Sequence, residues 1–157
     1  MMILLMLLLQ TTPVAPIVKG TALPPPGTEE AQVMVPVAAL LRAIETSDRA
    51  AALAATLPEG TITATRTGPD GAPQRRTLRW ADWAAQLTPE QGPVAEKQGT
   101  PAIEIDDHAA MVWAPYTVTV AGKPVQCGYN LFDVVRGAAG WKILNVTYSA
   151  RTEGCTS

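Results

Sequence analysis

The sequence predicts an α+β domain in which helices come first and antiparallel strands follow. Between residues 28 and 57, apolar side chains recur at the spacing of amphipathic helices. From residue 102 to residue 150, β-branched and apolar residues alternate with polar ones between short turn sequences, as they do in antiparallel strands. A parallel βαβ protein would alternate the two patterns along its length, so that class is not favoured.

Composition narrows the range of functions. The 157 residues are enough for one domain, the net charge is only −2, and the sequence contains no run of like charges. A nucleic-acid partner is therefore not predicted. One histidine and two cysteines show no recognisable metal-ligand spacing, so we predict no metal site and no cofactor.

Residues 1–27 are predicted to be a signal-like leader followed by a Pro-rich spacer, and residues 28–157 the folded domain. Residues 1–9 are all apolar, which is typical of the core of an export signal but too short to cross about 30 Å of hydrocarbon. We therefore expect a periplasmic or secreted protein with no stable membrane anchor after processing. No basic residue precedes this run and no clear cleavage site follows it. The alternative is a hydrophobic first helix of the domain.

Three helices are expected. A hydroxyl cap at Thr28, followed by two glutamates, predicts the start of the first helix, in which Pro36 causes a kink or marks the first regular turn. Asp48 caps a shorter second helix that ends near Leu57. The third helix places on one face Trp80, Trp83, Ala84 and Leu87.

Strand patterns cover residues 61–67, 74–78, 102–106, 109–120, 124–136 and 141–150. Residues 88–101 contain three prolines and two glycines and lack an apolar period, so they are predicted to form a loop. A loop of this length within a small domain suggests a lid over a pocket.

The two cysteines, Cys127 and Cys155, are predicted to form a disulfide bond, as an even pair in an exported protein commonly does. In the expected last hairpin Cys127 lies opposite Ala150, so the short tail could fold back to it. Such a bond would stabilise the fold by about 3 kcal/mol. Two free thiols in a cytosolic protein are the alternative.

Three segments carry a resemblance to a known family: AMVWAPY at residues 110–116, CGYNLF at residues 127–132 and GWKI at residues 140–143. In this order they resemble the C-terminal half of the nuclear-transport-factor-2-like superfamily, which includes SnoaL-like, ketosteroid-isomerase-like and lumazine-binding proteins. The resemblance extends over about residues 30–151. It implies a cone-shaped fold, in which three N-terminal helices pack on a strongly bent antiparallel β-sheet with a pocket between them. Members of the superfamily include enzymes and non-catalytic binding domains, so the fold alone does not decide the function.

Strand alternation assigns the side chains of the last three strands to two faces, if Val120 lies opposite Lys123 and Arg136 opposite Trp141. One face is predicted to line the pocket for a small apolar or aromatic ligand, with Trp83 joining it from the third helix. The predicted lining residues on the strands are Met111, Trp113, Asn130, Phe132, Asn145 and Thr147. Alternatively, the two asparagines satisfy each other or nearby backbone groups.

The opposite face is too apolar and aromatic to be wholly solvated, so we expect it to pair two copies of the chain as a homodimer. The residues predicted for this dimer face are Tyr116, Tyr129, Leu131, Leu144 and Tyr148. On the expected register Tyr129 lies directly opposite Tyr148. Coverage by the N-terminal spacer or the C-terminal tail is the alternative.

No catalytic set is recognisable, so a binding protein is the leading interpretation. Enzymes of the superfamily that the chain resembles commonly use a carboxylate that points into the pocket. The candidate groups Asp106, Asp107 and His108 are instead expected in a solvated hairpin turn. An isomerase, dehydratase or hydrolase that uses Asp82 or an unplaced carboxylate is the second interpretation. A structural or assembly module is the third. An inward, desolvated carboxylate next to a second polar group would favour an enzyme.

Overall fold

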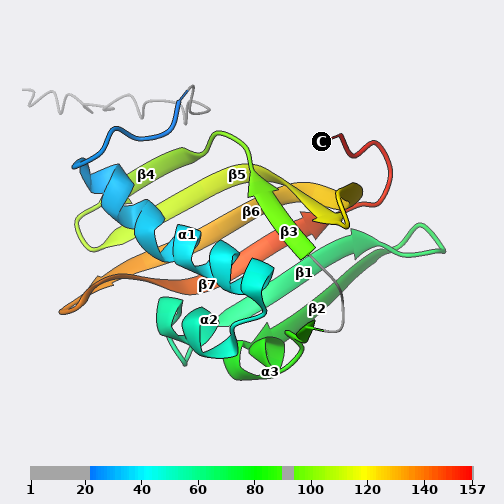
Figure 1. Ribbon diagram of the computed structural model, residues 1–157, viewed down its shortest axis with the longest axis horizontal. Helices are drawn as coiled ribbons and strands as arrows, with labels where there is room; N and C mark the ends of the chain where they lie inside the picture. The colour runs from blue at the N-terminus through cyan, green and yellow to red at the C-terminus, as the bar shows by residue number, and fades with distance from the viewer. Residues whose placement is uncertain (1–21, 90–93, 157) are drawn as a thin grey trace, which may run out of the picture.

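The computed structural model describes residues 22–89 and 94–156, so the predicted leader lies outside the described residues (Figure 1). The elements in chain order are α1 (Glu29–Thr46), α2 (Arg49–Ala55), β1 (Thr61–Thr67), β2 (Pro73–Arg79), α3 (Trp80–Ala84), β3 (Val94–Gln98), β4 (Ala102–Asp106), β5 (Ala109–Val120), β6 (Lys123–Gly137) and β7 (Gly140–Ala150). The α+β class is confirmed.

The helices begin where the sequence predicts. The Thr28 hydroxyl accepts a hydrogen bond from the Ala31 N–H at 3.2 Å, and the Asp48 carboxylate accepts one from the Ala51 N–H at 2.9 Å. Pro36 lies within α1 and is buried. The second helix is shorter than predicted, because it ends at Ala55.

The strands form one seven-stranded sheet in the order β2-β1-β7-β6-β5-β3, with β4 also paired to β5. The prediction of a wholly antiparallel sheet is wrong at one place, because β1 runs parallel to its neighbour β7. The chain between β1 and β7 contains all the other strands, so these two parallel neighbours are joined by a long connection and not by a tight turn.

The predicted loop at residues 88–101 contains a strand, which corrects that interpretation. Val94–Gln98 pairs antiparallel with the far end of β5, from Val94 opposite Val120 to Gln98 opposite Tyr116. The sequence pattern predicts a loop there because the segment has few apolar residues and is flanked by prolines and glycines. Residues 90–93 lie outside the described residues, and with them part of the predicted lid.

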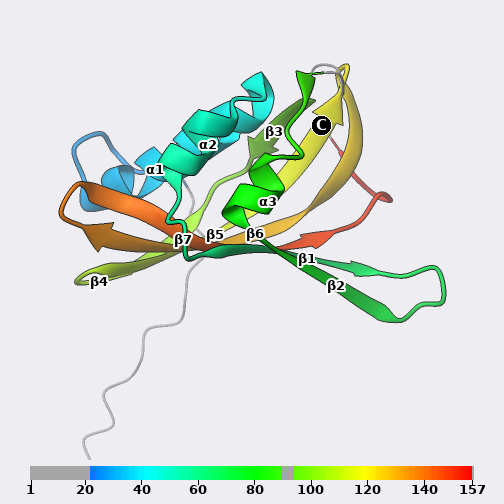
Figure 2. The same ribbon diagram turned by 90° about the horizontal axis from the view of Figure 1, so that it is seen from below.

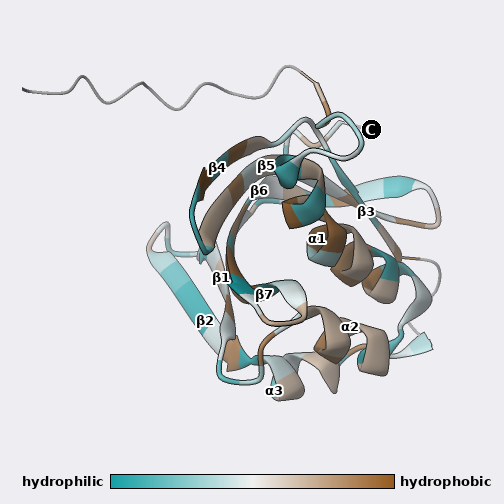
Figure 3. Cartoon of the chain, turned by 90° about the vertical axis from the view of Figure 1, so that its left-hand side faces the viewer, coloured by the Kyte–Doolittle hydropathy of each residue, from teal (hydrophilic) through white to brown (hydrophobic). Residues whose placement is uncertain are grey.

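All three helices pack on the same face of the sheet, which we call the inner face (Figure 2). Figure 3 shows hydrophobic residues over much of α1 and β5. The hydrophobic core lies between the helices and the sheet. It contains buried side chains of α1 and of the strands β5, β6 and β7: Val33, Val37, Leu40, Val112, Phe132, Val134 and Ile143. The β1–β2 hairpin extends beyond the helices, so part of its inner face is not covered by them (Figures 1 and 2).

None of the described helices is long and apolar enough to cross a membrane.

Candidate functional site

Two irregularities in the sheet decide which side chains face the helices. The predicted pairs are correct at the turns, with Val120 opposite Lys123 and Arg136 opposite Trp141. Further along, however, the register shifts by one residue between β5 and β6 and again between β6 and β7. Because side chains alternate between faces, each shift moves the rest of one strand to the face opposite to the predicted one.

The shift between β6 and β7 occurs at Leu144, which is the extra residue between Ile143 and Asn145. The Trp80 indole N–H donates to the Leu144 carbonyl at 2.9 Å. Gly60 lies against the same carbonyl, where a side chain would overlap it. A side chain of α3 therefore stabilises the bulge through a hydrogen bond, and the glycine before β1 leaves room for the same carbonyl.

Four residues predicted to line the pocket point away from the helices, to what we call the outer face: Met111, Trp113, Asn145 and Thr147. The prediction that they converge with Asn130 is wrong because of the two bulges. The Asn145 amide instead accepts from the Thr61 N–H at 3.1 Å and donates to Asp133 at 3.3 Å, so it joins strands. Asn130, Phe132 and Trp83 do lie on the inner side and line one cavity.

The residues of the predicted dimer face do not all lie on one face of the sheet. Tyr116 and Tyr148 lie on the inner face, where their rings make an edge-to-face contact with centroids 6.1 Å apart. Tyr148 is paired with Asn130, so the predicted opposition of Tyr129 and Tyr148 is wrong. Tyr129 and Leu131 lie on the outer face, where Leu131 is opposite Trp113.

The cavity lies between the inner face and the helices and has a volume of about 200 Å³. Its walls are mainly apolar and come from α1, from α3 and the residues after it, and from the strands: Leu40, Leu41, Ile44, Trp83, Leu87, Phe132 and Val146. Its polar lining comes from β3, β5, β6 and β7: Glu96, Tyr116, Gln126, Asn130 and Tyr148. An apolar enclosure with a few converging polar groups is the usual composition of a small-molecule site.

Glu96 provides the inward carboxylate that the sequence interpretation did not find. The strand pairing places it opposite Val118, on the inner face, and the Asn130 amide donates to its Oε1 at 2.7 Å. Burial raises the pKa of Glu96 to about 6, although the hydrogen bond from Asn130 lowers it in part. Glu96 can thus exchange a proton near neutral pH, which an exposed glutamate does far less readily.

Asp82, the carboxylate considered from the sequence, does not have this environment. It is exposed on α3 and is not part of the cavity lining. Asp107 and His108 lie in the predicted turn, where both side chains are exposed and Asp107 Oδ1 is 3.5 Å from His108 Nε2. Glu96 was missed because it belongs to the segment that was predicted to be a loop.

Two tyrosines complete the polar part of the cavity. The Tyr116 hydroxyl donates to the Ser149 carbonyl at 2.9 Å and accepts from Gln126 at 2.8 Å. Burial raises the pKa of both Tyr116 and Tyr148 above the ordinary value, so both remain neutral near pH 7. The site therefore combines one titratable carboxylate with amide and phenol groups.

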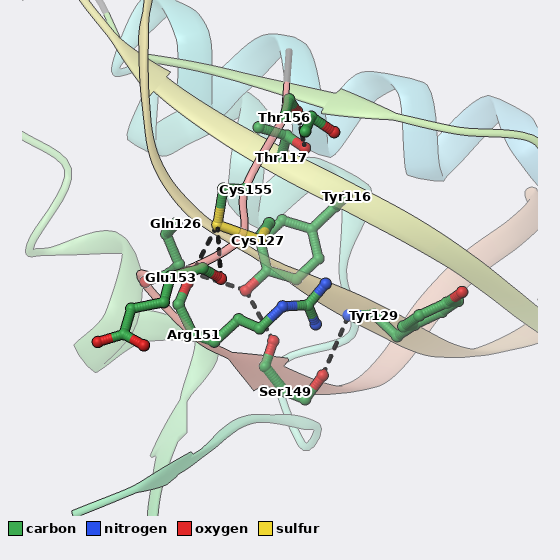
Figure 4. The surroundings of a disulfide bond; sticks show 10 residues. All are labelled: Tyr116, Thr117, Gln126, Cys127, Tyr129, Ser149, Arg151, Glu153, Cys155 and Thr156. Atoms are coloured by element: carbon green, nitrogen blue, oxygen red, sulfur yellow. Dashed lines mark hydrogen bonds between the residues drawn. A yellow bond between two sulfur atoms is a disulfide. The ribbon is translucent and has the colours of Figure 1, made fainter.

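The disulfide between Cys127 and Cys155 is present and joins the C-terminal tail to β6 (Figure 4). Cys127 pairs with Arg151 rather than with the predicted Ala150, again because the register shifts at the bulge. Their backbones exchange two hydrogen bonds of 2.9 Å. The described residues contain no group of three His, Cys, Asp or Glu side chains that could hold a metal ion.

No protein-family model and no curated protein matches the sequence. Solved structures do match the fold. A nuclear transport factor 2-like superfamily protein from Salmonella enterica has a TM-score of 0.60 at 18% identity, with 81% of this chain and 94% of that chain covered. A protein of the same description from Cytophaga hutchinsonii gives 0.64 at 13% identity, covering 79% and 99%.

A third similar structure comes from Novosphingobium aromaticivorans and is described as a candidate aromatic ring hydroxylase. Its TM-score is 0.57 at 18% identity, with 76% of this chain and 86% of that chain covered. At identities this low the likeness is one of fold, and an activity does not follow from it.

Proposed function

We propose that this chain, which has the nuclear-transport-factor-2-like fold, binds a small apolar or aromatic molecule in the cavity between its helices and its sheet. The observation that carries the proposal is the pair formed by Glu96 and Asn130 at 2.7 Å within an otherwise apolar lining. The pair offers a polar ligand group a charged acceptor, while the walls remove the rest of the ligand from water.

Energetics support a role in binding for Glu96. A buried carboxylate opposes folding unless it is well paired, and here one amide hydrogen bond partly compensates for its burial. A glutamine at the same position would remove this cost. A side chain that weakens the fold at the wall of a cavity is typical of a site kept for function.

A thermal-shift screen of small aromatic and alicyclic compounds against the full chain tests binding. We expect ligands that stabilise the wild type to lose this effect in Asn130→Leu, which removes the amide from the cavity. Asn145→Leu is the matched control, because that amide lies on the outer face and its loss should leave the ligand-induced shift unchanged. Equal shifts in both variants would contradict the proposal.

A proton-transfer enzyme is the second candidate, and the burial of Glu96 favours it. The carboxylate would take a proton from a carbon next to a ligand carbonyl, and the electron pair left behind would move to the carbonyl oxygen. Deuterium exchange of a bound ketone, followed by NMR, tests this. We expect Glu96→Gln to bind the ketone but to abolish exchange, and retained exchange would rule out Glu96 as the base.

We also infer that the chain works outside the cytoplasm. The disulfide between Cys127 and Cys155 supports this, because such bonds persist in oxidising compartments. The apolar leader of the sequence agrees with it. Fractionation of cells that express the full chain with a C-terminal tag should recover it among exported proteins, and a wholly cytoplasmic product with free thiols would contradict the inference.

The homodimer remains a proposal, with a corrected set of residues. Trp113 is 36% exposed and stacks on Tyr129 with ring centroids 5.0 Å apart, next to Leu131 on the outer face. Exposed aromatic side chains of this kind are enriched at interfaces. Tyr116 and Tyr148 are no longer part of the proposed surface, because they lie on the inner face.

A further inference from the structure

A second hollow adjoins the cavity at the uncovered part of the β1–β2 hairpin. It has a volume of about 540 Å³ and lies over the inner face of this hairpin. Four side chains line both spaces: Ile62, Trp83, Gln126 and Tyr148. The hollow is therefore the mouth of the cavity, and a ligand that extends beyond the apolar walls would enter it.

Three arginines line this mouth: Arg66, Arg75 and Arg76. In the β1–β2 pairing Arg66 is opposite Gln74 and Arg76 is opposite Ala64, which places both arginines on the inner face as diagonal neighbours. The Arg66 Nε donates to Gln74 Oε1 at 3.1 Å, and the Arg66 side chain is exposed. No acidic side chain of residues 22–89 or 94–156 forms an ion pair with any of the three.

The two ends of the combined space thus carry opposite charge. Glu96 lies among the apolar walls, and the guanidinium groups lie at the exposed end. Tyr148 lies between these groups, and both affect its pKa. Burial raises the pKa of Tyr148 and the charge of Glu96 raises it further, whereas Arg76 and Arg66 lower it. This gradient would attract an anionic group to the mouth and repel it from the Glu96 end, which would orient an asymmetric ligand.

We propose that the ligand of this site is an amphipathic organic anion, whose apolar body fills the cavity and whose anionic group is bound by Arg66 and Arg76 at the mouth. The proposal rests on the proposed binding function and adds the chemical class of the ligand. Arginine pairs are well suited to the task, because a guanidinium offers a carboxylate two parallel hydrogen bonds. A merely solvated hairpin edge would give no preference among ligands with the same apolar body.

Isothermal titration calorimetry with matched probes tests the proposal at pH 7.5. The probes are 2-naphthoate and decanoate as anions, with 2-naphthalenemethanol and 1-decanol as their neutral counterparts. We expect at least one anion to bind about tenfold more tightly than its neutral counterpart, a difference that should diminish as salt is added. In the double variant Arg66→Gln/Arg76→Gln this preference should disappear while the neutral probe binds as before.

The control variant is Arg42→Gln/Lys123→Gln, which changes the net charge equally and removes exposed cations that line neither space. It should keep the preference for the anion. Equal binding of the anion and its counterpart by the wild type, or an unchanged preference in the arginine variant, would overturn the anionic class and leave the binding function standing. Failure of all four probes to bind would count against both.

Discussion

The inner and outer faces of the β5–β6–β7 sheet are built from similar side chains, yet they provide different environments. On the inner face Tyr116 is buried and its hydroxyl makes two hydrogen bonds, while Tyr148 lines the cavity. On the outer face Trp113 and Tyr129 stack on each other, and Trp113 is exposed. Residue type therefore does not identify the face, and the bulges decide it.

The loss of stability on truncating a side chain should differ most strongly between the two faces. Phe132 on the inner face is 1% exposed, and Phe132→Ala should lower the free energy of unfolding by about 3–5 kcal/mol because it leaves a cavity in the core. Leu131→Ala, one residue away on the outer face, should cost about 1 kcal/mol. Urea denaturation of both variants measures the difference, and equal losses would show that the faces are assigned wrongly.

The disulfide holds the tail to β6 on the outer side, and its removal should have the next largest effect. The bond closes a loop with a sequence separation of 28 residues. The double variant Cys127→Ser/Cys155→Ser should lose about 3–4 kcal/mol of stability, mainly through greater entropy of the unfolded chain. Denaturation under non-reducing conditions measures this loss, and the wild type in excess reductant should reproduce it.

The carboxylate on the inner side should make stability depend on pH in an unusual direction. Because the pKa of Glu96 is raised to about 6 in the folded state, protonation favours folding, and this contribution is lost as pH rises from about 4.5 through 6. A shift of this size corresponds to about 2 kcal/mol. We expect Glu96→Gln to be more stable than the wild type at pH 7.5 by about this amount and to lose the advantage at pH 4.

Glu104→Gln is the control for this measurement. Glu104 is exposed on β4 and lies opposite Met111, on the outer face. Urea denaturation across the same pH range should give no comparable gain for this variant. A parallel pH dependence in the wild type and Glu96→Gln would contradict the assigned environment of Glu96.

The exposed aromatic stack should have the smallest effect on the stability of a single chain. Trp113→Ala should change it by about 1 kcal/mol or less, because the ring is partly solvated already. Its effect should appear in association, and size-exclusion chromatography with light scattering at micromolar concentration should show fewer dimers. A wild type that is wholly monomeric would end the dimer proposal.

The sequence allowed the elements to be predicted well and the site only in part. Helix caps at Thr28 and Asp48 and the turns between the long strands have local causes, so they could be read from a few neighbouring residues. The bulge at Leu144 has no such signal, since leucine is ordinary in a strand. It depends on Trp80 and Gly60, which are distant in the sequence.

The position of Glu96 could not be predicted for a related reason. Its strand has few apolar residues, and it becomes a strand because β5 offers it an edge to pair with. Asn130 and Phe132 lie on β6, which pairs with both β5 and β7, and they face the cavity as the sequence predicts. The other four predicted residues lie beyond a bulge on the neighbouring strands: Met111, Trp113, Asn145 and Thr147. The one-residue shift at each bulge places them on the face opposite to the predicted one.

The bulge at Leu144 makes the chemistry of the site depend on how β6 pairs with β7 as well as on its residues. If β7 continued from the turn without this bulge, with Leu144 opposite Asp133, Asn145 and Thr147 would point toward the helices, and Val146 and Tyr148 would point outward. A shift of one residue in the pairing of β6 with β7 would thus exchange the apolar and phenolic wall of the cavity for one of amide and hydroxyl groups. The groups that the cavity offers to a ligand therefore depend on strand register, and they can change with no substitution among the residues of the cavity.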